Sequence, residues 1–246
     1  MSERQTSDPT AALRLLWGEG PQPRRGPRRG LELGRIVAAA VELADEEGER
    51  GLSMRGVASR LGIGTASLYT YVPSRTELTA LMLDAVIGEA PMPEDLPGTW
   101  REKIEAWARG DWAMFRARPW ALRLVERALL GPNLLAWYES ALRALSENGL
   151  SPVENASVIE SVDAYVQGVA RLTADQEENL ADGAEPWDAR HRAYIARRVD
   201  FSAYPLWAEA AAGDALGGPA DHFESGLRML LDGVEAEVRR RPAPQD

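Results

Sequence analysis

The chain has no cysteine and only two histidines, His191 and His222, among its 246 residues. The missing cysteines exclude disulfides, thiolate metal sites and cysteine nucleophiles. A zinc site or histidine-dependent catalysis would have to use both histidines. His191 lies in a charged run and His222 near the start of a predicted helix, and these positions favour solvated or capping roles. We therefore expect neither a metal nor a cofactor.

Long apolar runs are also absent, because no stretch approaches the roughly 18 residues that a membrane-spanning helix needs. The N-terminal MSERQTSDPT lacks the basic-then-apolar order of a signal peptide. Hydrophobic residues make up 45% of the chain, which is ordinary for a soluble protein with a core. We expect a cytoplasmic protein that makes no contact with a membrane.

Charge is distributed unevenly along the chain, whose net charge is −10. In residues 1–86, eleven arginines balance eleven Asp and Glu residues, so the remaining 160 residues carry the whole excess of negative charge. Lysine is nearly missing, with Lys103 the only one. The chain thus combines a locally basic N-terminal part with an acidic remainder.

The first 30 residues join a short candidate helix, Ala11 to Trp17, to the run PQPRRGPRRG, which cannot sustain a helix or bury a core. We predict a flexible basic arm over residues 1–30. Its arginines, with Arg28 and Arg29 as the chosen candidates, are typical of arms that enter the minor groove of DNA. The alternative is a disordered, solvated tail that does not contact DNA.

Four helices are predicted within residues 31–87, because apolar residues recur at helical spacing between capping and glycine signals. Ser53 and Thr65 are expected to cap the second and third helices, and Ser74 the fourth, with Glu77 in the capping-box position. The expected ranges are 33–48, 53–61, 65–71 and 74 onwards.

The second and third of these helices, joined by a tight turn at residues 62–64, form a helix-turn-helix pattern. Leu61, Ile63 and Leu68 are spaced to pack the two helices together. The rest of the third helix is small, hydroxylated or aromatic, which suits contacts to phosphates, thymine methyl groups and base edges. These residues are Thr65, Ala66, Ser67, Tyr69, Thr70 and Tyr71. For the two tyrosines, the alternative is a place in the core.

The combined motifs resemble the DNA-binding head of the tetracycline-repressor (TetR) family over roughly residues 31–87. The resemblance rests on GLS at 51–53, LGI at 61–63, LY at 68–69 and YV at 71–72, followed by a turn that contains Arg75. It implies that Ser53 and Arg75 grip phosphates at helix N-termini. It also implies that Arg55 and the outward residues of the third helix approach base edges or backbone, although Arg55 has the alternative of a solvated charge.

Residues 94–240 show helical patterns and no strand-like alternation, and residues 241–246 are expected to be a disordered tail. Helices are predicted near 99–118, 120–130, 134–148, 152–178, 188–199 and 222–240. The predicted fold class is all-α, with an N-terminal three-helix helix-turn-helix head and a larger helical ligand-binding and dimerisation domain. By resemblance, the last long helices form a dimer interface, although their apolar stripes also suit an intramolecular core.

A ligand site is predicted in this body, because Trp107, Asp111 and Phe115 share one face of its first helix. A carboxylate among aromatic rings needs a partner, which Arg127 or a ligand group would supply. Further aromatic candidates are Trp137, Tyr138 and Tyr165. The expected effector is a small aromatic or multi-ring molecule, and the alternative is that these rings are only core. The founding repressor's metal-binding histidine has no counterpart before His191, so metal-tetracycline recognition is not expected.

The predicted function is a ligand-responsive transcriptional regulator, by resemblance a repressor, that binds double-stranded palindromic operator DNA as a homodimer. A small-molecule effector would release it by moving the fourth helix. Two alternatives belong to other classes: a helical enzyme using Asp111, Asp163 or Asp175, and an adaptor whose helix-turn-helix binds protein. No nucleophile–base pair, glycine-rich nucleotide loop or metal-ligand spacing supports an enzyme, so no catalytic residue is assigned.

Overall fold

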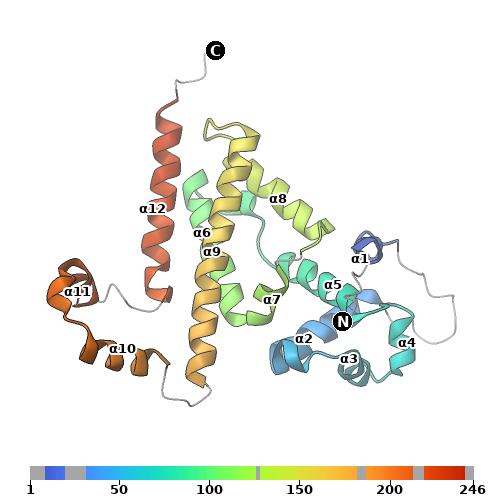
Figure 1. Ribbon diagram of the computed structural model, residues 1–246. Helices are drawn as coiled ribbons and strands as arrows, with labels where there is room; N and C mark the ends of the chain where they lie inside the picture. Colours follow the sequence, from blue (N-terminus) through green and yellow to red (C-terminus); the bar gives the residue numbers. More distant parts are fainter. Residues whose placement is uncertain (1–8, 20–31, 126–127, 182–186, 213–218, 242–246) are drawn as a thin grey trace, which may run out of the picture. The chain divides into compact units, whose positions relative to one another are not determined.

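A computed structural model describes residues 9–19, 32–125, 128–181, 187–212 and 219–241 (Figure 1). Within these ranges every regular element is a helix, and the predicted all-α class is confirmed. The chain forms two compact units. The first unit is Met1–Gly110 with Ala117–Asn148, and the second is Asp111–Arg116 with Gly149–Asp246.

The first unit holds the head helices, the greater part of α6 and the two helices that follow it. Its elements are α1 (Pro9–Leu16), α2 (Leu33–Gly51), α3 (Met54–Arg60), α4 (Thr65–Tyr69), α5 (Arg75–Ile87), η1 (Pro93–Asp95), most of α6 (Trp100–Ala117), α7 (Pro119–Leu124) and α8 (Pro132–Leu145). The second unit holds residues 111–116 of α6, together with α9 (Pro152–Ala181), α10 (Trp187–Arg198), η3 (Phe201–Ala203), α11 (Pro205–Ala212) and α12 (Pro219–Arg239).

The head helices begin and end close to their capping signals. Ser53 caps α3 by accepting a hydrogen bond from the amide of Gly56 (3.0 Å), and Ser74 caps α5 by accepting one from Thr76 (3.1 Å). The expectation for Thr65 is wrong, since Gly64 is the N-cap of α4 and provides no side-chain cap. The helix also ends earlier than predicted, at Tyr69.

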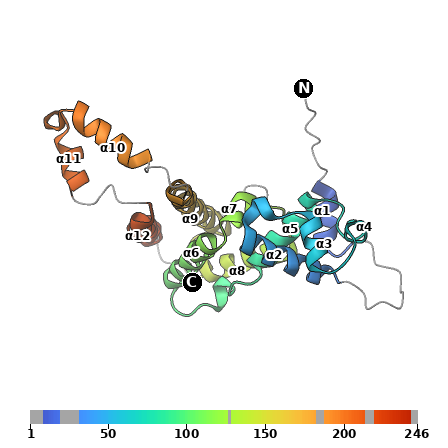
Figure 2. The ribbon, with the colours of Figure 1, turned by 90° about the horizontal axis from the view of Figure 1, so that it is seen from below.

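Helix α1 packs against α5, and Figure 2 shows it among the head helices. Its Ala12 and Leu15 are buried, and the Trp17 indole N–H donates to the carbonyl oxygen of Leu130 (3.1 Å). The prediction of a flexible arm is therefore wrong for residues 9–19, because an amphipathic turn of helix finds an apolar partner in α5. Arg28 and Arg29 lie outside the described residues.

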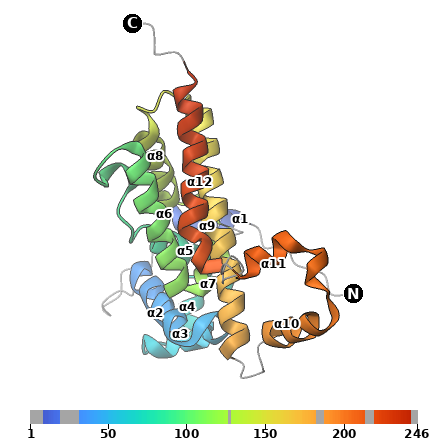
Figure 3. The ribbon, with the colours of Figure 1, turned by 90° about the vertical axis from the view of Figure 1, so that its left-hand side faces the viewer.

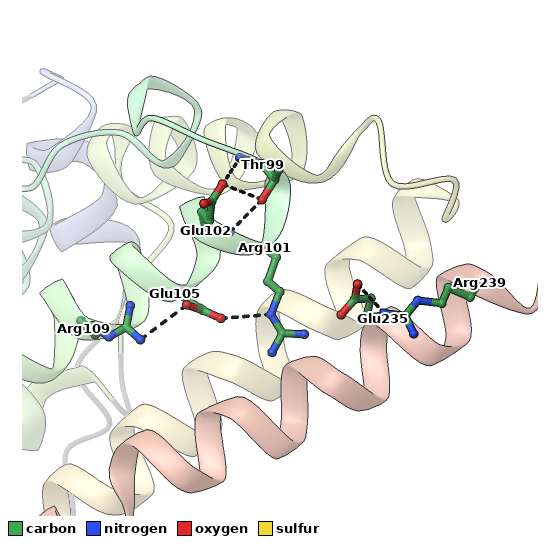
Figure 4. A network of polar contacts seen from close by, with 7 residues as sticks. All are labelled: Thr99, Arg101, Glu102, Glu105, Arg109, Glu235 and Arg239. Atoms are coloured by element: carbon green, nitrogen blue, oxygen red, sulfur yellow. Dashed lines mark hydrogen bonds and ion pairs between the residues drawn. The ribbon is translucent and has the colours of Figure 1, made fainter.

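Helix α6 starts at a capping box, as Figure 4 shows. The Glu102 carboxylate accepts hydrogen bonds from the amide (2.7 Å) and hydroxyl (2.9 Å) of Thr99. Further along the helix, Glu105 pairs with Arg101 one turn earlier (3.0 Å) and with Arg109 one turn later (3.5 Å). These local pairs explain why the observed start of α6 is within one residue of the predicted one.

In the second unit, α9 and α12 lie side by side and run antiparallel (Figures 1 and 3). The buried residues of the pair are Ile159, Val162 and Val166 of α9 and Phe223, Leu227 and Leu231 of α12. At one end, Arg241 forms an ion pair with Glu154. On the surface of α12, Arg239 pairs with Glu235 (2.7 Å; Figure 4).

The start of α9 is fixed by a second capping box. The Ser151 hydroxyl (2.6 Å) and amide (2.9 Å) both donate to the Glu154 carboxylate. These two hydrogen bonds, with the nearby Arg241, lower the pKa of Glu154 to about 2. Helix α11 was not predicted, because its alanine-rich sequence PLWAEAAA has no amphipathic spacing to detect.

The head and the first part of the body pack together in the first unit, where α5 contacts α7 and α8, and α2 contacts α7. The predicted domain boundary at residues 87–94 is therefore not where the compact units divide. Helix α7 is also shorter than the helix predicted at residues 120–130, because it ends at Leu124.

A buried carboxylate on α5 holds the start of α8. Asp84 is only 6% exposed, and its oxygens accept hydrogen bonds from the amides of Asn133 (3.3 Å) and Leu134 (3.1 Å). The Asn133 side-chain amide donates back to the Asp84 carbonyl oxygen (3.0 Å). The N-cap of α8 is Gly131, where a Cβ would collide with this carboxylate. Asp84 thus caps a helix far from it in the sequence.

Replacing this cap, Asp84→Ala, should lower the free energy of unfolding by about 2 kcal/mol, because two amides at the start of α8 lose a charged acceptor. Urea unfolding monitored by circular dichroism measures this change. The control is Asp95→Ala, at the exposed end of η1, for which we expect about 0.5 kcal/mol or less. Equal losses in the two variants would contradict the capping role.

Candidate DNA interface and effector site

Helices α3 and α4 contact each other across a tight turn. Gly62 adopts a φ of 67°, in the left-handed region that favours glycine, and the amide of Ile63 donates to the Ala58 carbonyl oxygen (3.0 Å). Val57 of α3 and Leu68 of α4 are fully buried. The sequence therefore folds locally into the predicted helix-turn-helix, with one face of α4 directed into the head.

The opposite face of α4 is open. Tyr69 is 47% exposed, and Tyr71 is only half-buried, so neither ring is a fully enclosed core aromatic. Thr70 uses its hydroxyl hydrogen locally, donating to the Ser67 carbonyl oxygen (2.7 Å). The remaining candidates are also accessible, with Ala66, Ser67 and Thr70 exposed and Thr65 half-buried. Each of the six predicted residues of this segment is therefore at least partly accessible to solvent.

The cationic candidates differ in how they are held. Arg55 is exposed on α3, and its guanidinium forms no hydrogen bond or ion pair with another described residue. Arg75 is exposed at the start of α5, where its guanidinium donates to the carbonyl oxygen of Glu49 (2.8 Å) and lies 3.4 Å from its carboxylate. Ser53 is exposed but uses its oxygen as the cap of α3. Arg55 is therefore the candidate most available to phosphate or base.

Other head arginines are neutralised by acids of α2. Arg60 lies 2.5 Å from Glu46 and 3.9 Å from Glu42, and the hydrogen bond to Glu46 is the largest contribution to its raised pKa. The acidic run at residues 45–49 thus pairs with arginines outside α4. Among the described residues, Arg55 forms no ion pair with an acidic side chain.

In the first unit, three of the predicted ligand-site rings form one cluster. Trp107 of α6 meets Trp137 of α8 edge to face, with ring centroids 5.0 Å apart, and Trp137 meets Tyr138 at 5.8 Å. Both tryptophans are buried, whereas Tyr138 is half-buried. Arg127, the proposed partner for Asp111, lies outside the described residues.

In the second unit, Tyr165 is the predicted residue that contacts Phe223 among the described ring contacts. Tyr165 stacks on Phe223 (5.9 Å), and its hydroxyl donates to the Phe223 carbonyl oxygen (2.9 Å). Burial raises the pKa of this tyrosine. Phe115 is buried and Asp111 half-buried on α6. Sequence reasoning missed Trp112, which stacks on the same ring at 4.7 Å.

A polar junction between head and body helices was also missed. Arg118, just before α7, donates to Asp45 of α2 (3.2 Å) and to Glu89 beyond α5 (2.5 Å), and the Trp120 indole donates to Asp45 (2.7 Å). Burial lowers the pKa of Arg118, but the hydrogen bond to Glu89 and the two carboxylate charges outweigh it, so the pKa is raised. No local pattern indicates these pairs, because their partners are 29 to 75 residues apart.

Two negative findings apply to the described ranges alone. They contain no group of three or more His, Cys, Asp or Glu residues placed to hold a metal ion. None of their helices is both long and apolar enough to cross a membrane.

Two family models match the chain. Residues 36–82 match the bacterial regulatory proteins of the tetR family, and residues 92–238 match the tetracyclin repressor-like C-terminal domain. The second match alone covers more than half of the chain. Helix α1 and the segment that follows it lie outside both matches.

Curated relatives and solved structures agree. The chain is 42% identical over 243 residues to the HTH-type transcriptional repressor DrrR1 of Streptomyces coeruleorubidus, covering 96% of this chain and 89% of that protein. It is 32% identical over 236 residues to an HTH-type transcriptional regulator of Saccharopolyspora erythraea, covering 96% and 97%. The structure resembles Streptomyces coelicolor ActR in complex with actinorhodin, with a TM-score of 0.73, 28% identity, and coverage of 85% and 97%.

These matches confirm the predicted family, and they set aside the enzyme interpretation, because the matched proteins are named as regulators. The helix-turn-helix head, the helical body and the family matches lead to one conclusion: the chain belongs to the TetR family of bacterial transcriptional regulators.

Proposed function

We propose that the protein is an effector-released repressor that binds palindromic operator DNA as a homodimer. The observation that carries the proposal is the open face of α4, with exposed hydroxyls and Tyr69, together with the exposed Arg55 of α3, whose side chain has no ion-pair partner in the part of the chain that the structure describes. A short helix of this composition suits the major groove, where arginine reads guanine and threonine methyl groups meet thymine. The name of the 42% identical relative supports repression as the direction of control.

On DNA, Arg55 supplies a base or phosphate contact, and the hydroxyls of Ser67 and Thr70 supply backbone or base-edge contacts. Arg75 binds phosphate by exchanging its Glu49 carboxylate contact for a phosphate oxygen. Tyr69 lies against the sugar-phosphate backbone. Arg28 and Arg29, in the basic segment before α2, add minor-groove contacts in the proposed complex.

The DNA interface is tested by footprinting the purified protein on the intergenic DNA next to its own gene, across a series of salt concentrations. Arg55→Ala and Tyr69→Ala should each weaken specific binding by about tenfold or more, and Arg55→Ala should reduce the salt slope by about 1 if the contact is to phosphate. The matched control is Arg197→Ala, at an exposed position of α10, which should bind as the wild type does. No specific protection at any salt concentration would refute the proposed interface.

The proposal of a homodimer is supported by a face of α9 that is exposed within the described part of the chain. Small residues recur there at spacings of three and four, all of them exposed: Ser157, Ser161, Ala164 and Gly168. The hydroxyls of Ser157 and Ser161 donate to carbonyl oxygens of their own helix. Burying these two hydroxyls in an interface would therefore not leave their hydrogens without an acceptor. Val153, 77% exposed, and Leu172 lie on the same helix, and Met229 is exposed on α12. A second copy covering these residues would form a close helix packing.

Placing a charge on this face, Ala164→Glu, should convert the dimer to a monomer, because two buried carboxylates would face each other across a two-fold axis. Analytical ultracentrifugation measures the association state, and circular dichroism verifies that the helices remain. Ala193→Glu, at an exposed position of α10, is the control and should stay dimeric. A wild-type monomer at micromolar concentration, or a dimeric Ala164→Glu variant, would contradict this interface.

The effector site is proposed in the body, with the aromatic cluster of Trp107, Trp137 and Tyr138 as its recognition surface in the first unit. In the second unit, Asp111, Phe115 and Tyr165 are proposed separately as ligand contacts, and Arg127, which lies outside the described residues, stays a prediction. The rings favour a flat, multi-ring molecule. The actinorhodin complex of the 28% identical ActR supports this ligand class.

Coupling between effector and DNA is proposed to run through α8. This helix carries Trp137 and Tyr138, and its first turn is held by Asp84 of α5, the last helix of the head. Arg118 adds a second connection by bridging Asp45 and Glu89. A ligand that shifts α8 would therefore move α5 and change the spacing of two recognition helices, which must lie roughly 34–36 Å apart on DNA.

Actinorhodin provides a probe for this coupling. It should quench tryptophan fluorescence and weaken operator binding about 5- to 150-fold, the usual range for allosteric coupling. Trp137→Leu should weaken actinorhodin binding while leaving operator binding without ligand intact. Trp207→Leu, at an exposed tryptophan of α11, is the control for both measurements. Actinorhodin that binds without changing operator affinity would refute the coupling.

A further inference from the structure

The first unit contains a cavity of about 510 Å³ that shares no residue with the aromatic cluster. It lies between α1, α2, α5 and the start of α8. Its apolar wall includes Leu15 and Leu16 of α1, Val37 and Val41 of α2, and Leu81 of α5. This volume is within the usual range for small-molecule sites, and the wall is of the apolar kind that such sites use.

The polar part of the lining is strongly acidic. It contains four carboxylates, Glu42, Asp45, Asp84 and Glu89, and one cation, Arg118. Three of the carboxylates are held by hydrogen bonds, Asp84 at the α8 amides and Asp45 and Glu89 at Arg118. Glu42 is mostly exposed and lies 3.9 Å from Arg60. An apolar cavity with this excess of fixed negative charge selects a cation that also has apolar surface.

We propose that this cavity is a second small-molecule site, which binds an apolar molecule carrying one amine cation. The apolar part lies against the leucines and valines of α1, α2 and α5. The ammonium group lies near Glu89 and Asp45, where it shares their negative charge with Arg118. Helix α1 forms part of the wall and lies outside both family matches, so the site depends on a segment that the family models do not describe.

This site is separate from the proposed DNA interface and effector cluster. Its test uses the full-length protein without DNA, so the result does not depend on the proposed function. The probe is monodansylcadaverine, a fluorescent aromatic group on a primary alkylamine, and its neutral N-acetyl derivative is the matched control. Dansyl emission should increase and shift to shorter wavelength on binding. The neutral derivative should bind about tenfold more weakly, as expected when one charge interaction near a protein surface is lost.

Two variants fill the cavity from residues that are not fully buried, Ala38→Phe on α2 and Ala85→Phe on α5. Each folded variant should lose monodansylcadaverine binding, while Ala196→Phe, at an exposed position of α10, should bind as the wild type does. Glu89→Gln should remove most of the preference for the cation over the neutral derivative. Circular dichroism identifies which variants are folded.

Several results would overturn the proposal. Wild-type protein that binds neither probe at millimolar concentration has no such site. Undiminished binding in a folded Ala38→Phe or Ala85→Phe variant places the probe elsewhere on the protein. Equal affinity for the amine and its acetyl derivative shows that the carboxylates do not select a cation.

Discussion

The arrangement of the first unit depends on one buried carboxylate that satisfies the start of a distant helix. Asp84 belongs to α5, the last helix of the head, yet its oxygens accept the amides at the start of α8. The first amides of a helix have no partners within the helix, and Gly131 has no side chain to provide one. Because a charged acceptor supplied by another helix fills this need, α5 and α8 are held in one geometry. The proposed route from effector to DNA follows from this constraint.

Charge pairing divides the surface of the head into two kinds of arginine. Arg60 and Arg75 contact acids from the run at residues 45–49, and this run therefore serves the structure of the head. Arg55 forms no such contact with another described residue. The overall net charge of −10 thus says little about DNA binding, since what matters is which cations remain available beside α4.

Much of the local structure could be predicted because its causes are local. The caps at Ser53, Ser74, Thr99 and Ser151 act over two or three residues, and apolar spacing identifies the buried faces of α2, α9 and α12. The capping signal at Thr65 was misleading, because the N-cap position of α4 falls one residue earlier, at Gly64, which has no side chain to act as a cap. Helix α11 was missed because alanine-rich sequence carries no periodic signal.

The sequence by itself determined the all-α class, the helix-turn-helix and the family, since each depends on motifs with short spacing. Only the tertiary structure decided that α1 packs on α5, that Asp84 caps α8, and that Asp45 and Glu89 share Arg118. It also decided which rings meet, with Trp137 against Trp107 in one unit and Tyr165 against Phe223 in the other. These contacts join residues far apart in the chain, and no periodicity or spacing encodes which distant groups will meet.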